Sequence, residues 1–260
     1  MATLSPFPPE SLPQRALIEL KGDGILPFLH NILTCDVENL IQGGLAYGAL
    51  LSPQGKILHD VFIHNGGGAV MVDCDAGQRD TLVAKLKLYR LRAKFEITPR
   101  DDLEVVSGGE GPVDPRHAAL GARRVLPKGS AAAGQNYDTA RYALGIADSG
   151  EIGSGALFPH EANFDQFGAV DFKKGCYIGQ EVVSRMQHRA TARSRILPVS
   201  LIDQAADELR AGDVLLGEVL GRRGGAGLAL MRLDRLAETP KPWPVQVSKP
   251  GWATFEVPGT

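Results

Sequence analysis

The stretch DFKKGCYIGQEVVSRMQHR, residues Asp171–Arg189, decides the fold that the sequence predicts. Gly175 and Gly179 bracket Cys176 and Tyr177, and the apolar residues that follow recur at the spacing of one helix face. Because glycine accepts a positive φ, the segment predicts a tight strand-to-helix turn that presents Cys176 at a helix N-terminus. A helix N-terminus lowers the pKa of a thiol and favours the reactive thiolate. The alternative is a cysteine that only packs in the core, as many free cysteines do.

The composition is that of an ordinary globular protein. The 260 residues are 43% hydrophobic and 22% charged, and they contain no run of about 18 apolar residues that would cross a membrane. A net charge of −2 argues against a broad surface for nucleic acid. Cys35, Cys74 and Cys176 are odd in number and widely spaced, which predicts no disulfide framework. Residues 1–15 have no apolar signal core and fit a transit peptide poorly, so we expect a cytoplasmic protein.

Helical and strand-like patterns mix before residue 190, and strands alone follow it. After a proline-rich arm over residues 1–13, the strands predicted in the first part cover residues 15–20, 45–51, 56–64, 69–73, 95–98, 103–107 and 123–126. Those predicted after Arg195 cover residues 196–202, 214–216, 218–220, 226–233, 245–247 and 254–257, a spacing typical of a small β-barrel. We therefore predict the α+β class, with a body of residues 1–190 and a barrel of residues 191–260 that meet near Thr191.

Helix boundaries are predicted from capping residues. Asp23 is expected to cap a helix that ends near Leu33, and Asp138 to cap a helix through Leu144. The most regular helical pattern covers residues 76–93, and a short helix is predicted over residues 160–167.

Two carboxylates are candidates for chemistry. Asp60 shares a strand face with Leu58 and Phe62, where burial would raise the pKa of its carboxyl and suit general acid–base work. The alternative is a partly exposed charge at a sheet edge. Glu161 opens the predicted short helix, either as a stabilising charge in the first turn or as the acceptor of two N–H donors from a heterocycle.

Charged residues continue after the cysteine segment. Glu181 precedes Arg185 by four residues, the favourable order for an ion pair on a helix. The basic residues that form either a solvated stretch or a site for a polyanionic tail such as polyglutamate are Lys173, Lys174, His188, Arg189, Arg193 and Arg195.

Several other motifs are missing from the sequence. There is no P-loop, and the glycine-rich residues 221–227 lack the spacing of a dinucleotide fingerprint and are interpreted as turns. The histidines show no metal-ligand spacing, so no catalytic metal is predicted.

The segment Lys174–Glu181, preceded by FPHEANFD at residues 158–165, resembles the signature of the YgfZ family. These are folate-binding proteins of iron–sulfur cluster maintenance, similar to the glycine-cleavage T-protein, an aminomethyltransferase. Residues 47–60, YGALLSPQGKILHD, resemble the N-terminal hairpin of the family, and residues 225–230 with Trp252 are similar to its C-terminal barrel. The resemblance covers nearly the whole chain.

This resemblance implies two interleaved α+β subdomains and a C-terminal β-barrel around a central channel that holds tetrahydrofolate. Asp60 matches the acidic residue near the folate nitrogens in the T-protein, and Glu161 matches the glutamate that holds the pterin edge. Lys174 is similar to a basic residue near the glutamate tail of folate. Tyr177 and Arg185 complete the residues expected at the folate site.

The cysteine segment departs from the T-protein, whose corresponding segment lacks it. Cys176 and Asp60 are therefore the candidate catalytic residues of a tetrahydrofolate-binding accessory protein for iron–sulfur cluster assembly or repair. A [4Fe–4S] cluster takes four thiolates, so cluster assembly proteins or client enzymes would supply the other ligands. The alternative is a folate-dependent aminomethyltransferase or other one-carbon transferase, which needs a second substrate site beside the folate.

Overall fold

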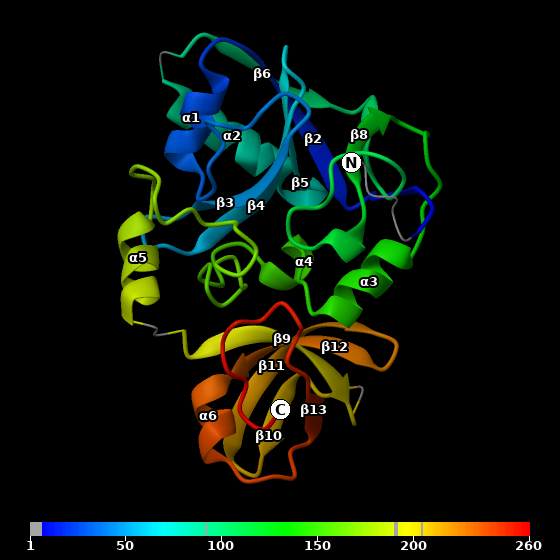
Figure 1. Ribbon diagram of the computed structural model, residues 1–260, viewed down its shortest axis with the longest axis vertical. Coiled ribbons are helices and arrows are strands. Elements are labelled where there is room, and N and C mark those ends of the chain that lie inside the picture. The colour runs from blue at the N-terminus through cyan, green and yellow to red at the C-terminus, as the bar shows by residue number, and fades with distance from the viewer. Residues whose placement is uncertain (1–6, 92, 190–191, 204) are drawn as a thin grey trace.

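The structure of the protein, a computed structural model, describes residues 7–91, 93–189, 192–203 and 205–260. It has three parts, each built on an antiparallel sheet (Figure 1). The predicted boundary near Thr191 lies outside the described residues, and so do residues 1–6 of the predicted N-terminal arm. The division into residues 1–190 and 191–260 therefore stays a prediction.

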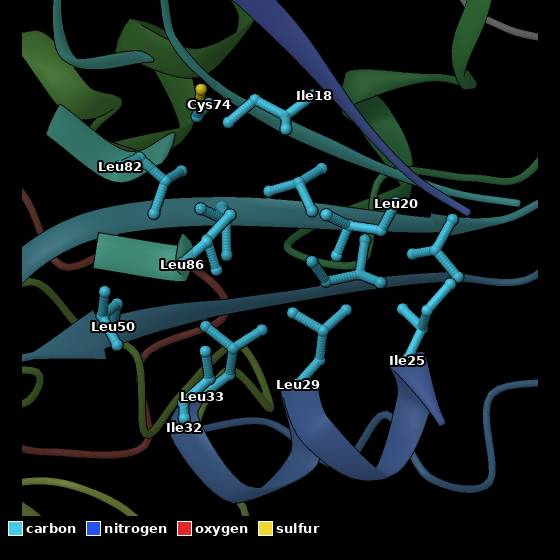
Figure 2. Packing of buried hydrophobic residues seen from close by; sticks show 14 of the residues in the cluster. Ile18, Leu20, Ile25, Leu29, Ile32, Leu33, Leu50, Cys74, Leu82 and Leu86 are labelled. Atoms are coloured by element: carbon cyan, nitrogen blue, oxygen red, sulfur yellow. The ribbon is translucent and has the colours of Figure 1, made fainter. Parts of the chain in front are cut away.

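The first part is a five-stranded sheet with the order β3-β4-β5-β2-β6. Its strands are β2 (Arg15–Gly22), β3 (Leu45–Leu51), β4 (Ile57–Asn65), β5 (Val70–Asp75) and β6 (Phe95–Arg100). Its helices are α1 (Ile25–Ile32) and α2 (Arg79–Arg90), the latter preceded by the 3-10 turn η1 (Ala76–Gln78). Both helices pack on one face of the sheet, where Leu29 and Leu86 meet Ile18 and Leu20 (Figure 2). The apolar side chains on this face of the strands and the apolar stripes of the two helices therefore pack in one core.

The second part covers the opposite face of that sheet. Its elements are β1 (Glu10–Ser11), β7 (Leu103–Ser107), β8 (Arg123–Pro127), the 3-10 turn η2 (Ala118–Leu120), α3 (Asn136–Leu144) and α4 (Ser149–Ile152). Leu17 and Met71 of the first sheet pack with Val105, Leu120 and Tyr137 of this part. The first sheet is therefore enclosed on both faces, which explains why its charged residues can be deeply buried.

The third part is a curved sheet with the order β10-β11-β12-β9-β13, in which β10 and β13 are the edge strands of an open barrel (Figure 1). Its strands are β9 (Ser194–Leu201), β10 (Glu208–Ala211), β11 (Val214–Arg223), β12 (Ala226–Arg232) and β13 (Val245–Val247). The helix α6 (Leu233–Glu238) packs on it, and α5 (Gln180–Arg189) lies beside the first part (Figure 1). The α+β class and the C-terminal barrel are confirmed.

The predicted helix caps are wrong. The N-cap of α1 is Gly24 in the left-handed conformation, at φ 74°, rather than Asp23. Glycine adopts this conformation without the steric cost that a side chain would add. Asp138 lies in the first turn of α3, and the carboxylate of Glu10, 126 residues upstream of Asn136, receives the amide hydrogens at the start of that helix.

Some short elements also differ from the prediction. Residues 160–167 form turns rather than a helix, and residues 254–257 are not a strand. β10 and α6 were not predicted, since both are short and their patterns are weak. Residues 221–227 end β11 and begin β12, so the glycine-rich stretch is a hairpin, in line with the interpretation as turns.

Candidate functional site

Cys176 lies at the surface, on a loop that runs from Asp171 to Gly179 and ends where α5 begins. Residues 171–177 form bends and irregular backbone, so the predicted strand before the turn is wrong. Cys35 and Cys74 are only 2% and 1% exposed, and burial raises the pKa of both thiols to about 12. Of the three cysteines, Cys176 is the one that a partner protein or a reagent can reach.

Lys174 uses its ammonium group inside the protein. Its Nζ donates hydrogen bonds to the carbonyl oxygens of His30 (2.5 Å), Leu33 (2.7 Å) and Cys35 (2.8 Å) at the C-terminal end of α1. Burial, the main cause, lowers the pKa of this lysine. Because an ammonium group has three donors, these three carbonyls leave none for the glutamate tail of a folate. The contacts of Lys174 therefore oppose its predicted role as a folate ligand.

Tyr177 and Arg185 point in opposite directions. Tyr177 is buried among apolar side chains, which raises the pKa of its hydroxyl to about 12, and Lys174 Nζ lies 5.3 Å from its ring centre. Arg185 is on the exposed side of α5 and pairs with Glu181 one turn earlier. Tyr177 is a packing residue here, and Arg185 follows the ion-pair alternative.

Asp60 lies on β4, an interior strand of the sheet, and it is only 4% exposed. The hydroxyl of Ser149 donates a hydrogen bond of 2.5 Å to its Oδ1, and the hydroxyl of Tyr47 one of 3.4 Å to its Oδ2. Arg15 Nη1 lies 3.6 Å from Oδ2. The alternative of an exposed charge at a sheet edge is therefore wrong, but the carboxylate is already occupied by three groups of the protein.

Asp60 belongs to a larger set of buried charges between the first and second parts. Arg15 and Arg123 both bond Asp73, at 2.7 and 2.6 Å, while Arg116 lies 3.4 Å from Asp148. Burial alone would raise the pKa of Asp73 and Asp148, but the arginines hold both well below the usual range. Such groups pair with one another because a buried lone charge is very unfavourable.

Glu161 lies apart from this set, on the turns that follow Leu157. Its Oε2 accepts the amide hydrogen of Phe158 at 2.9 Å, and its main-chain oxygen accepts that of Ile196 at 2.8 Å. The side chain therefore closes a local turn, and the main chain holds the barrel strand β9. No helix exists at residues 160–167 for which Glu161 could supply a first-turn charge.

The space where the three parts meet is packed with apolar side chains. Tyr47, on β3, stacks against Phe62 and Phe164, with ring centres 4.5 and 5.0 Å apart, and Ile196 and Leu228 of the barrel join the same cluster. Small-molecule sites usually offer a cavity of about 300–1,000 Å³. The apolar cluster fills the junction of the three parts, where the resemblance implies a tetrahydrofolate channel.

A small polar cavity opens beside the buried charges. It has a volume of about 310 Å³ and is lined by Arg15, Asp148 and Ser149, together with Arg141 and Glu151. Arg141 and Glu151 already form an ion pair at 2.8 Å across it. Neither Glu161 nor Cys176 lines this cavity.

Sequence reasoning missed most of the buried charges, although a signal was present. Asp73 interrupts an apolar strand pattern, as Asp60 does, and Arg15 and Arg123 each open a strand. A charge within a strand that is otherwise apolar indicates burial with a partner. The pattern alone does not show which charge pairs with which.

In the part of the chain that the structure describes, no three His, Cys, Asp or Glu side chains are grouped so as to hold a metal ion. The helices of those same residues include none that is long and apolar enough to cross a membrane.

The overall fold is that of an aminomethyltransferase. The crystal structure of glycine cleavage system aminomethyltransferase T from Bartonella henselae superposes with a TM-score of 0.70, over 89% of this chain and 80% of that one. The two sequences are 13% identical, so this likeness concerns the fold alone. The C-terminal β-barrel domain of CAF17 matches residues 193–255.

Similar sequences are named as iron–sulfur cluster assembly factors. The mitochondrial factor IBA57 homolog of Pyricularia oryzae is 34% identical over 226 residues, 75% of this chain and 58% of that protein. The homolog of Chaetomium globosum is 33% identical over 83% of this chain and 61% of its own length. Human IBA57 is 27% identical over 85% of this chain and 76% of its own length. The chain thus spans little more than half of the fungal relatives.

These relatives correct one expectation. All three are named as mitochondrial proteins, so the prediction of a cytoplasmic location is wrong. The lack of transit-peptide features in residues 1–15 was a weak basis for it, because a targeting segment is read from a few residues outside the fold.

Proposed function

We propose that this protein acts in iron–sulfur cluster assembly by offering the Cys176 thiolate to a cluster that a partner protein also ligates. The observation that carries the proposal is the exposure of Cys176, while Cys35 and Cys74 are buried. Thiolates are the usual ligands of iron in such clusters, and one chain supplies too few of them. The partner is therefore a protein that bears further cysteines at its surface.

The surroundings of Cys176 suit contact with another protein. Phe172 is 38% exposed although it is aromatic, and the exposed residues Glu181, Arg185 and His188 continue from the loop onto α5. Aromatic residues and arginine are enriched where proteins bind one another. The relatives are named as iron–sulfur cluster assembly factors, and these names also support a role in contact with a cluster assembly protein.

Tetrahydrofolate binding is the less well supported part of the prediction. The aminomethyltransferase fold favours it, but the contacts of Asp60, Glu161 and Lys174 do not. The alternative of a one-carbon transferase shares the support of the fold, but the carboxylate of Asp60 is occupied by Ser149 and Arg15.

The proposal is tested with the purified full chain under anaerobic conditions. Ferrous iron and sulfide are added with glutathione, whose thiol replaces the missing partner ligands, and iron and visible absorption are measured after gel filtration. We expect iron to co-elute with the wild-type chain, and about tenfold less with Cys176→Ala, since the accessible ligand is removed.

Cys74→Ala is the matched control, because it removes a buried thiol. It is expected to retain iron as the wild type does. Equal iron in Cys176→Ala and the wild type would contradict the proposal.

A further inference from the structure

The loop that carries Cys176 is fixed on its N-terminal side by the end of α1. Lys174 Nζ bonds the carbonyl oxygens of His30, Leu33 and Cys35, and the amide of Asp171 donates a hydrogen bond of 2.9 Å to the carbonyl oxygen of Thr34. The last carbonyls of a helix have no partner within the helix, and a lysine satisfies them well. This side of the loop therefore lies directly on the segment of residues 30–36.

On its C-terminal side, two glycines bring the loop against the turn between β3 and β4. Gly179 has φ 81°, and a Cβ there would lie 2.6 Å from the carbonyl oxygen of Ser52 and 3.0 Å from the Cα of Gly55. Gly55 has φ 82°, and a Cβ there would lie 2.9 Å from the Cβ of Val182 on α5. Since any side chain would push the two segments apart, both glycines are required by close contact.

Between these two anchors, the chain turns outward at Gly175 and Cys176, which are both exposed. Tyr177 turns inward and is buried. The side chain of Gln180 donates a hydrogen bond of 3.4 Å to the carbonyl oxygen of Gly175. The main-chain amide of Gln180 donates one of 3.2 Å to the carbonyl oxygen of Tyr177. Cys176 is thus the apex of a short loop whose ends are both anchored.

We infer that Lys174, Gly179 and Gly55 are positioning residues, which hold the Cys176 thiol at a fixed place on the surface. The inference rests on the function proposed for Cys176. A loop that is already ordered loses little conformational entropy when a partner binds it. The residues around Cys176 in the segment therefore serve the thiol by fixing the backbone, and Lys174 does so through the carbonyl oxygens of His30, Leu33 and Cys35.

Hydrogen exchange of the purified chain tests the anchoring. Lys174→Met removes the ammonium group and keeps an unbranched side chain, so the amides of residues 171–180 are expected to exchange about tenfold faster or more. Lys173→Met is the matched control, because this exposed neighbour loses the same charge. Exchange at residues 171–180 that is unchanged in Lys174→Met, or equally faster in both variants, would overturn the inference.

A second variant changes the contact on the C-terminal side of the loop. Gly55→Ala places a methyl group against Val182 and is expected to speed exchange in residues 178–183 as well, whereas Gly68→Ala, on the next turn, meets open space and is expected to leave it unchanged. The pair keeps the test decisive if Lys174→Met does not fold. Unchanged exchange in Gly55→Ala would remove the role given to the glycines.

A separate experiment tests whether the anchoring matters for function. It measures the activity of a [4Fe–4S] enzyme in cells whose only copy of this protein is a variant. Lys174→Met is expected to lower that activity towards the level of Cys176→Ala, although its thiol is intact and is still alkylated by iodoacetamide. If Lys174→Met exchanges faster but supports full activity, positioning is not needed and the inference fails. If Cys176→Ala itself supports full activity, the proposed function fails, while the exchange data still decide whether the loop is anchored.

Discussion

Asp73 is a charged residue whose environment is set by partners far away in the sequence. It lies on β5, opposite Phe62 of β4, and is fully buried. Two guanidinium groups bond its carboxylate, from Arg15 at 2.7 Å and from Arg123 at 2.6 Å. Removing one partner of a buried ion pair leaves the charge of the other partner uncompensated. A single carboxylate here therefore contributes more to the free energy of unfolding than several carboxylates at the surface.

Asp73→Asn is expected to lower the free energy of unfolding by about 3–5 kcal/mol at pH 7, because Arg15 and Arg123 lose the charge that compensates them. Chemical denaturation of the purified variant measures the loss. Asp75→Asn is the control, since Asp75 is only partly buried on the same strand.

The same pair of measurements has a defined pH dependence. The arginines lower the pKa of Asp73 in the folded state, so its contribution is complete above the unfolded-state pKa of about 4 and is lost as the pH falls below it. The stability difference between wild type and Asp73→Asn should therefore be constant from pH 5 to pH 7, because these pH values lie about one unit or more above that pKa. It should shrink below pH 4; a difference that grows in acid would contradict this account.

Residue patterns predicted some of these positions and not others. Asp60 was singled out as a charge between apolar neighbours, a pattern that left burial and partial exposure at a sheet edge both open, and the structure shows it buried. Its partners Ser149 and Arg15 are 89 and 45 positions away along the chain, so no local pattern identifies them. Whether a buried carboxylate serves chemistry or only pairs with arginines depends on those distant partners.

At the scale of elements, α3 shows how a distant residue fixes a helix end. The carboxylate of Glu10 accepts the amide hydrogens of Asn136 at 3.0 Å and Tyr137 at 2.6 Å, and the side-chain amide of Asn136 at 3.1 Å. Glu10 is only 3% exposed, on the short strand β1. A carboxylate at a helix N-terminus also interacts favourably with the helix dipole.

Glu10→Ala should lower the free energy of unfolding by about 1–3 kcal/mol, because it leaves amide hydrogens at the start of α3 without acceptors. Asp138→Ala, which removes the residue that the sequence suggested as the cap, should cost less, roughly 0–1 kcal/mol, as its contact with Arg141 is partly exposed. Thermal unfolding of the two variants side by side compares them. A larger loss for Asp138→Ala would show that the assigned cap is wrong.

Strands were more predictable than helix ends for a physical reason. Neighbouring side chains of β3 and β4 lie on opposite faces of the sheet, and both faces are buried, so the apolar content that marks these strands lies within the strands themselves. The caps of α1 and α3 depend on backbone conformation at Gly24 and on Glu10, far away in the sequence. The turns at residues 160–167 depend on contacts with the barrel, such as that of Asn163 with Ile196 at 2.8 Å.

At the scale of the whole molecule, the barrel contacts the body at several places, and one of them is the start of β9. Arg195 at the start of β9 pairs with Asp165 at 2.6 Å, and Asn163 and Glu161 both bond the main chain of Ile196. Arg195 is therefore a structural link and is not available to hold a polyanionic tail, which was one interpretation of the basic stretch. The fold of an aminomethyltransferase is kept, while its centre is filled by apolar side chains.

The resemblance implies both a folate site and a functional thiol, and the structure distinguishes between these two possible bases of the function. In one, folate held by Asp60 and Glu161 carries the function; in the other, the thiol of Cys176 does. The exposed cysteine on an anchored loop, the occupied carboxylate of Asp60 and the local turn that Glu161 closes favour the thiol.

The most direct test compares Cys176→Ala with Glu161→Gln in cells that lack their own copy of the protein, by the activity of a [4Fe–4S] enzyme at equal expression. Gln keeps an oxygen that accepts the amide hydrogen of Phe158, so it leaves the turn intact while removing the charge expected to hold a pterin. The account predicts full activity with Glu161→Gln and the activity of the empty strain with Cys176→Ala. Full activity with Cys176→Ala, together with its loss in Glu161→Gln, would contradict it.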